Sequence, residues 1–88
     1  MHNYEINPNL QKIMKRLSKK DNQSYERIIK KIEEIINSYS IEHYKNLRHD
    51  LKDFKRVHIK EKVLTFHFNK TRDLITFEDF DHHDKIYQ

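Results

Sequence analysis

The first residues of the chain change from a strand pattern to a helix pattern. Tyr4–Ile6 alternates apolar and polar side chains, which predicts a short first strand. Asn7 and Pro8 then indicate a helix start, because asparagine caps a first turn well and proline fits the first helical position. Apolar residues follow at the i, i+3, i+4, i+7 spacing of one helix face: Leu10, Ile13, Met14 and Leu17. We therefore expect a strand followed directly by an amphipathic helix.

A second and stronger helical pattern follows a polar break at residues 18–22. Charged residues of both signs occupy one side, and Glu26 and Lys30 have the i, i+4 spacing that stabilises an exposed helix face. The apolar positions on the other side keep a single stripe for four turns: Tyr25, Ile28, Ile29, Ile32, Ile35, Ile36 and Tyr39. The two patterns together predict a helical hairpin whose apolar side is core and has no cofactor role.

The hydrophobic period falls from 3.6 to 2 in the last third of the chain. Residues 56–60 and 63–68 alternate between apolar and polar side chains, and residues 74–80 are rich in strand formers. Short breaks between these runs favour an antiparallel meander. Residues 37–53 have no clear period and are expected to form a connecting loop. The fold class is therefore α+β, with a short N-terminal strand, a two-helix hairpin and a three-stranded antiparallel meander.

Alternation also assigns the two faces of the predicted sheet. With a two-residue turn at 61–62, His58 lies opposite Thr65 and Arg56 lies opposite His67. The apolar positions 57, 59, 64, 66 and 68 then face the helices. We expect the other face to be basic, to carry histidines and to be open to solvent, so binding of a polyanion or catalysis would take place there.

Composition narrows the classes of function. The 88 residues are expected to form one domain, 1–88, with a thin core. The chain has no glycine, which excludes phosphate loops and dinucleotide fingerprints, and no cysteine, which excludes disulfides and thiolate sites and fits a reducing compartment. No run approaches the roughly 20 apolar residues of a membrane span. A net charge of +4 favours a polyanionic partner, and we expect a soluble cytoplasmic protein without a membrane partner.

Three of the seven histidines are candidates for chemistry. His58 lies in the middle of a predicted strand on the open face, and His82 and His83 follow the last strand. Two imidazoles with cations nearby meet the needs of metal-free RNA cleavage, in which a base removes the 2′-hydroxyl proton and an acid protonates the departing 5′-oxygen. Cations would stabilise the charge on the phosphorane. The alternative is that these are ordinary solvated histidines on a polar face.

Acidic residues near the last strand offer a competing interpretation as a metal site. The ligand types suit zinc or manganese, but their spacing matches no closed-site signature, and neighbouring strand residues point in opposite directions. The candidate ligands are Glu78, Asp79, Asp81, His82, His83 and Asp84. We therefore expect no metal and no cofactor, and keep a metal-dependent nuclease as a weaker alternative.

One segment of the chain concentrates basic residues that are candidates for RNA binding. Ordinary solubility is the alternative explanation for these charges. The cations are Lys45, Arg48, Lys52, Lys55, Arg56, Lys60 and Lys62. Phe54, Tyr44 and Tyr87 are candidate base-stacking groups, although core packing is the favoured role of Phe54.

The order of elements and two short motifs resemble the RelE/ParE toxin superfamily, and within it the YafQ-type mRNA interferases. The motifs are Phe-Lys-Arg-Val-His-Ile at 54–59 and His-Asp-Lys-Ile-Tyr at 83–87. The resemblance covers nearly the whole chain. It implies a microbial-RNase-like fold and ribosome-dependent endonucleolytic cleavage of mRNA without a metal. It also implies neutralisation by a cognate antitoxin, in a toxin–antitoxin complex that is oligomeric.

The resemblance assigns roles to particular residues. His58 corresponds to the strand histidine of the family and His83 to the histidine four residues before the terminal aromatic. That aromatic, Tyr87, resembles the stacking or proton-handling tyrosine of RelE-like members. His67 and His82 are possible supporting groups.

Three positions of the sequence depart from the family pattern. The family's loop histidine falls on Lys45, with His43 two residues earlier as a possible substitute. Its hairpin aspartate falls on Lys62, with Glu61 adjacent, and an arginine of RelE proper is replaced by Val63. These departures favour a rival hypothesis: a non-enzymatic ParE-like toxin that binds gyrase, or a weakened RelE-fold module that binds only its antitoxin.

Overall fold

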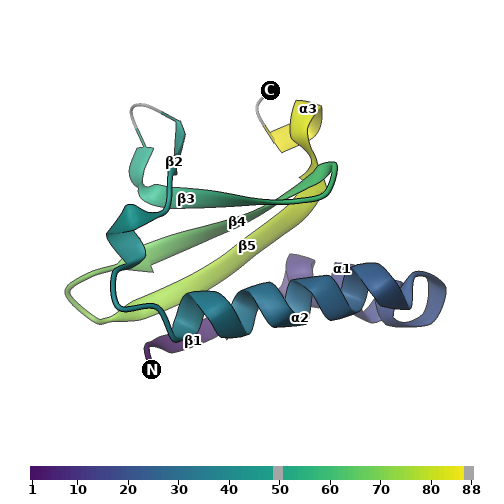
Figure 1. Cartoon of the computed structure of the whole chain (residues 1–88), viewed down its shortest axis with the longest axis horizontal. Helices are drawn as coiled ribbons and strands as arrows, with labels where there is room; N and C mark the ends of the chain where they lie inside the picture. The colour runs from purple at the N-terminus through teal and green to yellow at the C-terminus, as the bar shows by residue number, and fades with distance from the viewer. Residues whose placement is uncertain (49–50, 87–88) are drawn as a thin grey trace.

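Two helices cover one face of a five-stranded sheet, and a third short helix lies on its other side (Figure 1). The computed structural model describes residues 1–48 and 51–86. The strand order is β1-β5-β4-β3-β2. The helices are α1 (Pro8–Lys20), α2 (Asn22–Ile36) and α3 (His83–Ile86), and the strands are β1 (Asn3–Ile6), β2 (Asn46–Arg48), β3 (Leu51–Ile59), β4 (Lys62–Asn69) and β5 (Leu74–His82). The predicted α+β class is confirmed. Within the described ranges, no helix is long and apolar enough to cross a membrane.

The helical hairpin is tighter than the sequence pattern indicated. Asn7 caps α1 as predicted, because its side-chain oxygen accepts from the backbone N–H of Leu10 at 2.9 Å. The predicted break at 18–22 narrows to Asp21, which both ends α1 and caps α2. The apolar stripe predicted for the second helix extended too far at its C-terminal end. The helix α2 ends at Ile36, and the side chain of Tyr39 is fully exposed.

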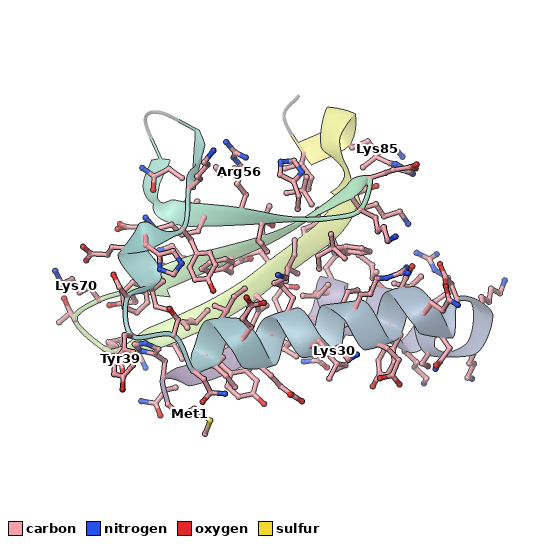
Figure 2. All side chains as sticks on the ribbon, viewed as in Figure 1. Met1, Lys30, Tyr39, Arg56, Lys70 and Lys85 are labelled. Carbon is pink, nitrogen blue, oxygen red and sulfur yellow. The ribbon has the colours of Figure 1, made fainter. Side chains whose placement is uncertain are left out.

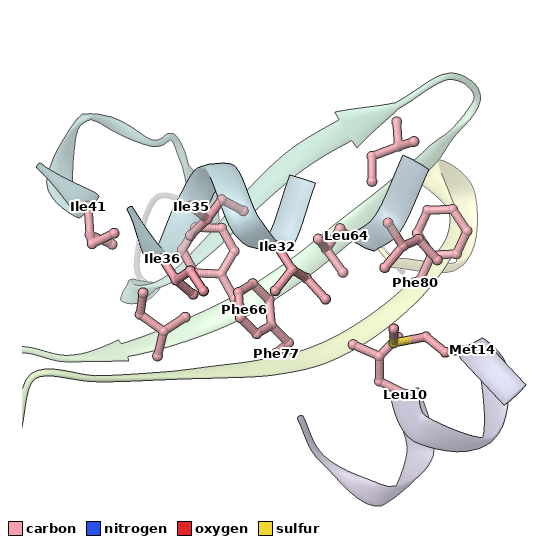
Figure 3. Packing of buried hydrophobic residues seen from close by; sticks show 13 residues of the cluster. Leu10, Met14, Ile32, Ile35, Ile36, Ile41, Leu64, Phe66, Phe77 and Phe80 are labelled. Atoms are coloured by element: carbon pink, nitrogen blue, oxygen red, sulfur yellow. The ribbon is translucent and has the colours of Figure 1, made fainter. Parts of the chain in front are cut away.

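The core lies between the hairpin and the sheet (Figure 3). The rings of Phe66 and Phe77 pack with their centroids 5.8 Å apart. An extra residue in β5, Glu78, forms a bulge opposite the Thr65–Phe66 step of β4. The bulge changes the alternation, so Phe77 and Phe80 both reach the core although they are three residues apart.

The predicted loop over residues 37–53 was wrong. It contains a short 3-10 helix, η1 (Ile41–His43), then β2 and the first residues of β3. Ile41 anchors η1 with only 2% of its surface exposed. The strand β2 has three residues, of which Leu47 is the one apolar member, so no alternation of period 2 could reveal it.

The turn between β3 and β4 comes one residue earlier than predicted. Lys60 adopts the left-handed conformation with φ of 60°, so Lys60 and Glu61 form the turn. His58 therefore lies opposite Val63, and Arg56 lies opposite Thr65. Each partner differs from the predicted one by two positions, which leaves every side chain on its predicted face.

The ends of the sheet and the hairpin are joined near the N-terminus. β1 pairs with β5 in parallel, and the backbone N–H of His2 donates to the carbonyl of Ile36 at 2.8 Å. The ring of His2 contacts Asp73 Oδ1 through Nδ1 at 2.5 Å and the Ser38 carbonyl through Nε2 at 2.8 Å. One side chain thus connects the first strand, the end of α2 and the β4–β5 turn.

Candidate functional site

The sheet face opposite α1 and α2 carries the candidate chemistry. Arg56 and His58 project from β3 on this open face, and Thr65 and His67 project from β4 beside them. Arg56 extends into the space between β2 and α3 (Figure 2). The candidate site therefore lies between the edge strand β2 and the short helix α3.

The guanidinium group of Arg56 is positioned by β2. Its Nε donates to the carbonyl of Asn46 at 3.1 Å, and its backbone N–H donates to the carbonyl of Lys45 at 3.0 Å. A guanidinium group is a planar fork of N–H donors whose geometry matches a phosphate. The short edge strand thus has a direct role in orienting a candidate phosphate-binding group.

Arg56 also contacts His58, with 3.3 Å between Nη1 and Nε2. The guanidinium group can only donate in such a contact, whereas the role of Nε2 depends on the tautomer of the imidazole. An exposed imidazole is a side chain that can act as a general base. The open face therefore places an imidazole beside a cation, two kinds of group that phosphodiester cleavage can use.

Phe54 and His67 form a second group on the same face. They lie directly opposite each other in the β3–β4 pair, and their ring centroids are 4.8 Å apart. The prediction that Phe54 is mainly a core residue was therefore wrong, because it is half-buried on the face away from the helices. Its ring offers a surface on which a base could stack.

Tyr44 packs against the core and is a poor candidate for base stacking. Its ring meets Phe66 edge to face at a centroid distance of 5.6 Å. Burial raises the pKa of its phenol above the usual 10, and the negative charge of Glu34 raises it further. Both observations assign Tyr44 to the helix-covered side.

The predicted RNA-binding cations do not share one face. Lys55 lies on the helix-covered side opposite Phe66, only 7% exposed, and its Nζ donates to Asn46 Oδ1 at 2.7 Å. Lys62 is also on that side, with its Nζ 5.4 Å from the ring centroid of Phe80. Neither lysine lies on the open face, where a polyanion was expected to bind, because both occupy the alternation positions of the core residues.

The remaining predicted cations are distributed around the sheet. Lys45 is exposed just before β2, and Lys60 is exposed in the β3–β4 turn. Arg48 belongs to β2 and Lys52 to β3, and the side chains of both lie outside the described part of the structure. Among the described side chains of this set, Arg56 is the one that points directly onto the open face.

The predicted partner of His58 is placed by its backbone alone. His83 begins α3, which lies on the same side of the sheet as Arg56 (Figures 1 and 2). The side chain of His83 and the whole of Tyr87 lie outside the described residues. Val63 is fully buried but does not belong to the core under the helices, which fits its position on the α3 side.

The possible supporting residues take three different positions. The ring of His43 stacks on Tyr44 at a centroid distance of 4.1 Å and contacts the carbonyl of Ser40. Glu61 is exposed in the β3–β4 turn. His82 lies opposite Lys62 and therefore on the helix-covered side. Across the described residues, no three histidine or carboxylate side chains come together as a possible metal site, and the side chains of His83 and Asp84 are not among them.

Sequence reasoning missed the cations that α2 contributes near His58. A shallow hollow of about 330 Å³ lies between α2 and the end of β3. Glu34 is its one acidic residue and pairs with Lys31 at 2.8 Å. The hollow is lined by Arg27, Lys30, Lys31, Glu34, His58, Ile59 and Lys60. The α2 pattern indicated an ordinary charged surface, and only the packing of α2 beside β3 reveals a basic channel that reaches the candidate base.

Comparisons with known proteins identify the family. No protein-family model matches the chain. The chain is 51% identical over 89 residues to "Putative toxin RelE4" of Methanocaldococcus jannaschii, covering 100% of this chain and 93% of the relative. It is 39% identical over 88 residues to an uncharacterized protein of Methanosarcina mazei, covering 99% and 100% of the two chains. Among solved structures, the conserved hypothetical protein HP0894 from Helicobacter pylori shares the fold, with a TM-score of 0.63, 17% identity and coverage of 96% and 97%. The chain belongs to the RelE family of toxins.

Proposed function

We propose that the protein is the toxin of a type II toxin–antitoxin system and cleaves mRNA on the ribosome, in the manner of the YafQ-type enzymes. The carrying observation is the pair formed by Arg56 and His58, in which a cation oriented by β2 lies with its Nη1 3.3 Å from Nε2 of an exposed imidazole. The family relationship supports the toxin role. The whole chain acts as one toxin domain in the cytoplasm.

The proposed reaction uses acid–base chemistry without a metal. Nε2 of His58 takes the proton of the 2′-hydroxyl, and the 2′-oxygen forms a bond to phosphorus. The bond from phosphorus to the 5′-oxygen breaks, and His83 protonates that oxygen as it leaves. Arg56 stabilises the negative charge of the phosphorane, and Tyr87 supports the substrate by stacking. The products are a 2′,3′-cyclic phosphate and a 5′-hydroxyl end.

The message has a basic path to His58. From the open face, the RNA backbone continues over the β3 edge into the hollow lined by Arg27, Lys30 and Lys60. A channel with four cations and one paired carboxylate attracts phosphates from solution. Lys45, exposed next to β2, extends the same path on the other side of Arg56.

A reconstituted translation reaction tests the proposal. The purified protein is added to translating ribosomes, and the 5′ ends of the message are mapped. We expect new ends with the wild type, and a rate lowered about 100- to 10,000-fold by His58→Ala, which is the usual effect of losing a general base. His82→Ala is the matched histidine control, because His82 lies on the opposite face of the sheet. Intact message with the wild type, or equal rates for both variants, would contradict the proposal.

The ParE-like rival has one observation in its favour. Two positions of the family pattern carry Lys62 and Val63, and the structure turns Lys62 away from the open face and buries Val63 completely. Inhibition of gyrase supercoiling without any cut in the message would support this rival. Cleavage of free RNA, without ribosomes, that is lost in EDTA would instead support the metal-dependent alternative.

The proposed partner proteins follow from the toxin role. A cognate antitoxin covers the basic open face, and the resulting complex is oligomeric. Co-expression of an acidic protein from the adjacent reading frame should abolish growth arrest. Persistence of the arrest would contradict the assignment of that protein as the antitoxin.

A further inference from the structure

The outer side of α1 carries the most uniform charge in the molecule. Every charged residue between Pro8 and Lys20 is a cation. We call the five residues the α1 cation stripe: Lys12, Lys15, Arg16, Lys19 and Lys20. At 3.6 residues per turn they occupy an arc of about 140° and a length of about 12 Å. All five are exposed, and the buried residues of α1, Leu10 and Met14, lie on the other side of the helix.

Helix stability does not explain this stripe. Lys19 and Lys20 lie in the last turn, where cations interact favourably with the helix dipole. Lys12, Lys15 and Arg16 lie outside it, and the stripe creates like-charge neighbours at i, i+3 and i, i+4, which destabilise a helix. Among the described residues, no carboxylate forms an ion pair with any member of the stripe. By contrast, α2 mixes both signs and contains the Lys31–Glu34 pair.

The chemistry of the stripe fits a polyphosphate better than a protein. A stable protein interface needs apolar groups at its centre. The arc of the stripe contains only Pro8 and Asn9 besides the cations, so it offers no such centre. Binding to a nucleic acid backbone needs only cations, because release of counterions supplies the free energy.

We propose that the α1 cation stripe binds the backbone of RNA without sequence preference, at a surface separate from the open face. The sheet lies between them, since α1 packs on the side away from Arg56 and α3 (Figures 1 and 2). The stripe thus holds a different stretch of RNA from the one that reaches His58. The proposal goes beyond cleavage and does not depend on it.

Equilibrium binding to a fluorescent single-stranded RNA tests the stripe. All variants carry His58→Ala, so that the proposed cleavage cannot affect the measurement. Lys15→Gln with Lys19→Gln is compared with a matched control of equal charge, Lys70→Gln with Arg72→Gln, in the exposed β4–β5 turn. We expect the stripe variant to reduce the magnitude of the slope of log affinity against log salt by about 1.4. Between 1 M and 0.1 M salt, its affinity for RNA should therefore rise about 25-fold less than that of the parent. The control should change affinity less than about threefold.

Two further measurements decide how a change in binding is interpreted. The melting temperature of the stripe variant should change little, because the variant relieves the repulsion between Lys15 and Lys19 and loses the interaction of Lys19 with the helix dipole. Lys12→Gln with Arg16→Gln provides an independent second pair, outside the last turn. Lys15→Arg with Lys19→Arg should bind as the parent does. Equal losses of RNA affinity in the stripe variant and the control would overturn the proposal. Unchanged RNA binding by the stripe variant would also overturn it, and a lost interaction with an acidic protein would then assign the stripe to that partner. If the wild type cuts no message but the stripe variant still loses RNA, the stripe stands and the cleavage proposal falls.

Discussion

The two faces of the sheet are built from the same strands and differ in almost every property. Towards the helices, Leu64, Phe66, Ile75 and Phe77 have no exposed surface. Towards solvent, the neighbouring positions carry a guanidinium, imidazoles and a half-buried aromatic ring. Because side chains alternate along a strand, each residue on one face is one peptide bond away from a residue on the other. Stability and chemistry can therefore be tested separately by substitutions at adjacent positions.

The largest expected effect is on the helix-covered face. Phe66→Ala should lower the free energy of unfolding by about 3–5 kcal/mol, because it leaves a cavity among fully buried side chains. Phe54→Ala is the matched control on the open face, where the ring is only half-buried and stacks on His67. Chemical denaturation should show the smaller loss for Phe54→Ala. Similar losses for both would contradict the division of the sheet into a core face and an open face.

The fold was largely predictable because its main signals are local. The first strand, the Asn7 cap, both helices and the last three strands follow from periodicity and capping chemistry. The β2 strand was missed because three residues on a sheet edge need no hydrophobic pattern. The position of the turn was missed because Lys60 takes a positive φ, which sequence propensity assigns to glycine or asparagine.

The second-largest expected effect is on the rate of message cleavage, and it depends on the planar donor geometry of the Arg56 guanidinium. Arg56→Ala should lower the rate of message cleavage about 100- to 1000-fold, the usual effect of removing a donor that stabilises transition-state charge. The cleavage rate of Arg56→Lys should lie between those of the wild type and Arg56→Ala, because lysine keeps the charge but loses the planar pair of donors. Cleavage by Arg56→Lys at the wild-type rate would show that charge alone suffices on the open face.

The site was less predictable than the fold because its members come from distant elements. Alternation correctly placed Arg56 and His58 on one face. It could not show that β2 orients Arg56, or that Lys30 of α2 reaches the hollow beside His58, since neither contact has a fixed sequence spacing. Lys55 and Arg56 are neighbours in the sequence, but alternation places them on opposite faces of the sheet, so a run of basic residues does not define one binding surface.

A substitution of Lys55 tests whether a cation must lie on the open face to take part in RNA cleavage. Its side chain is buried on the helix-covered side beside Asn46, so Lys55→Met should change the free energy of unfolding by less than about 1.5 kcal/mol, as expected when a buried ion is replaced by an apolar side chain of similar shape. The rate of cleavage should stay within about threefold of the wild type, since one lost phosphate contact would reduce affinity about tenfold. A larger loss of cleavage, with stability preserved, would return Lys55 to the set of RNA-binding residues.

The smallest expected effect is the acid sensitivity of the cap between the two helices. The hydroxyl of Ser24 at 2.6 Å and its backbone N–H at 3.2 Å lower the pKa of Asp21 below its usual 3.8, and the charges of Lys62 and Arg27 lower it further. A carboxyl with a lowered folded-state pKa stabilises the fold above about pH 3.8 and loses this contribution as the pH falls through the folded-state value. Asp21→Asn keeps a capping oxygen but cannot titrate. Between about pH 6 and pH 3, the melting temperature should therefore fall more steeply for the wild type than for Asp21→Asn. Parallel curves would mean that the charge of Asp21 does not help the cap to hold the two helices together.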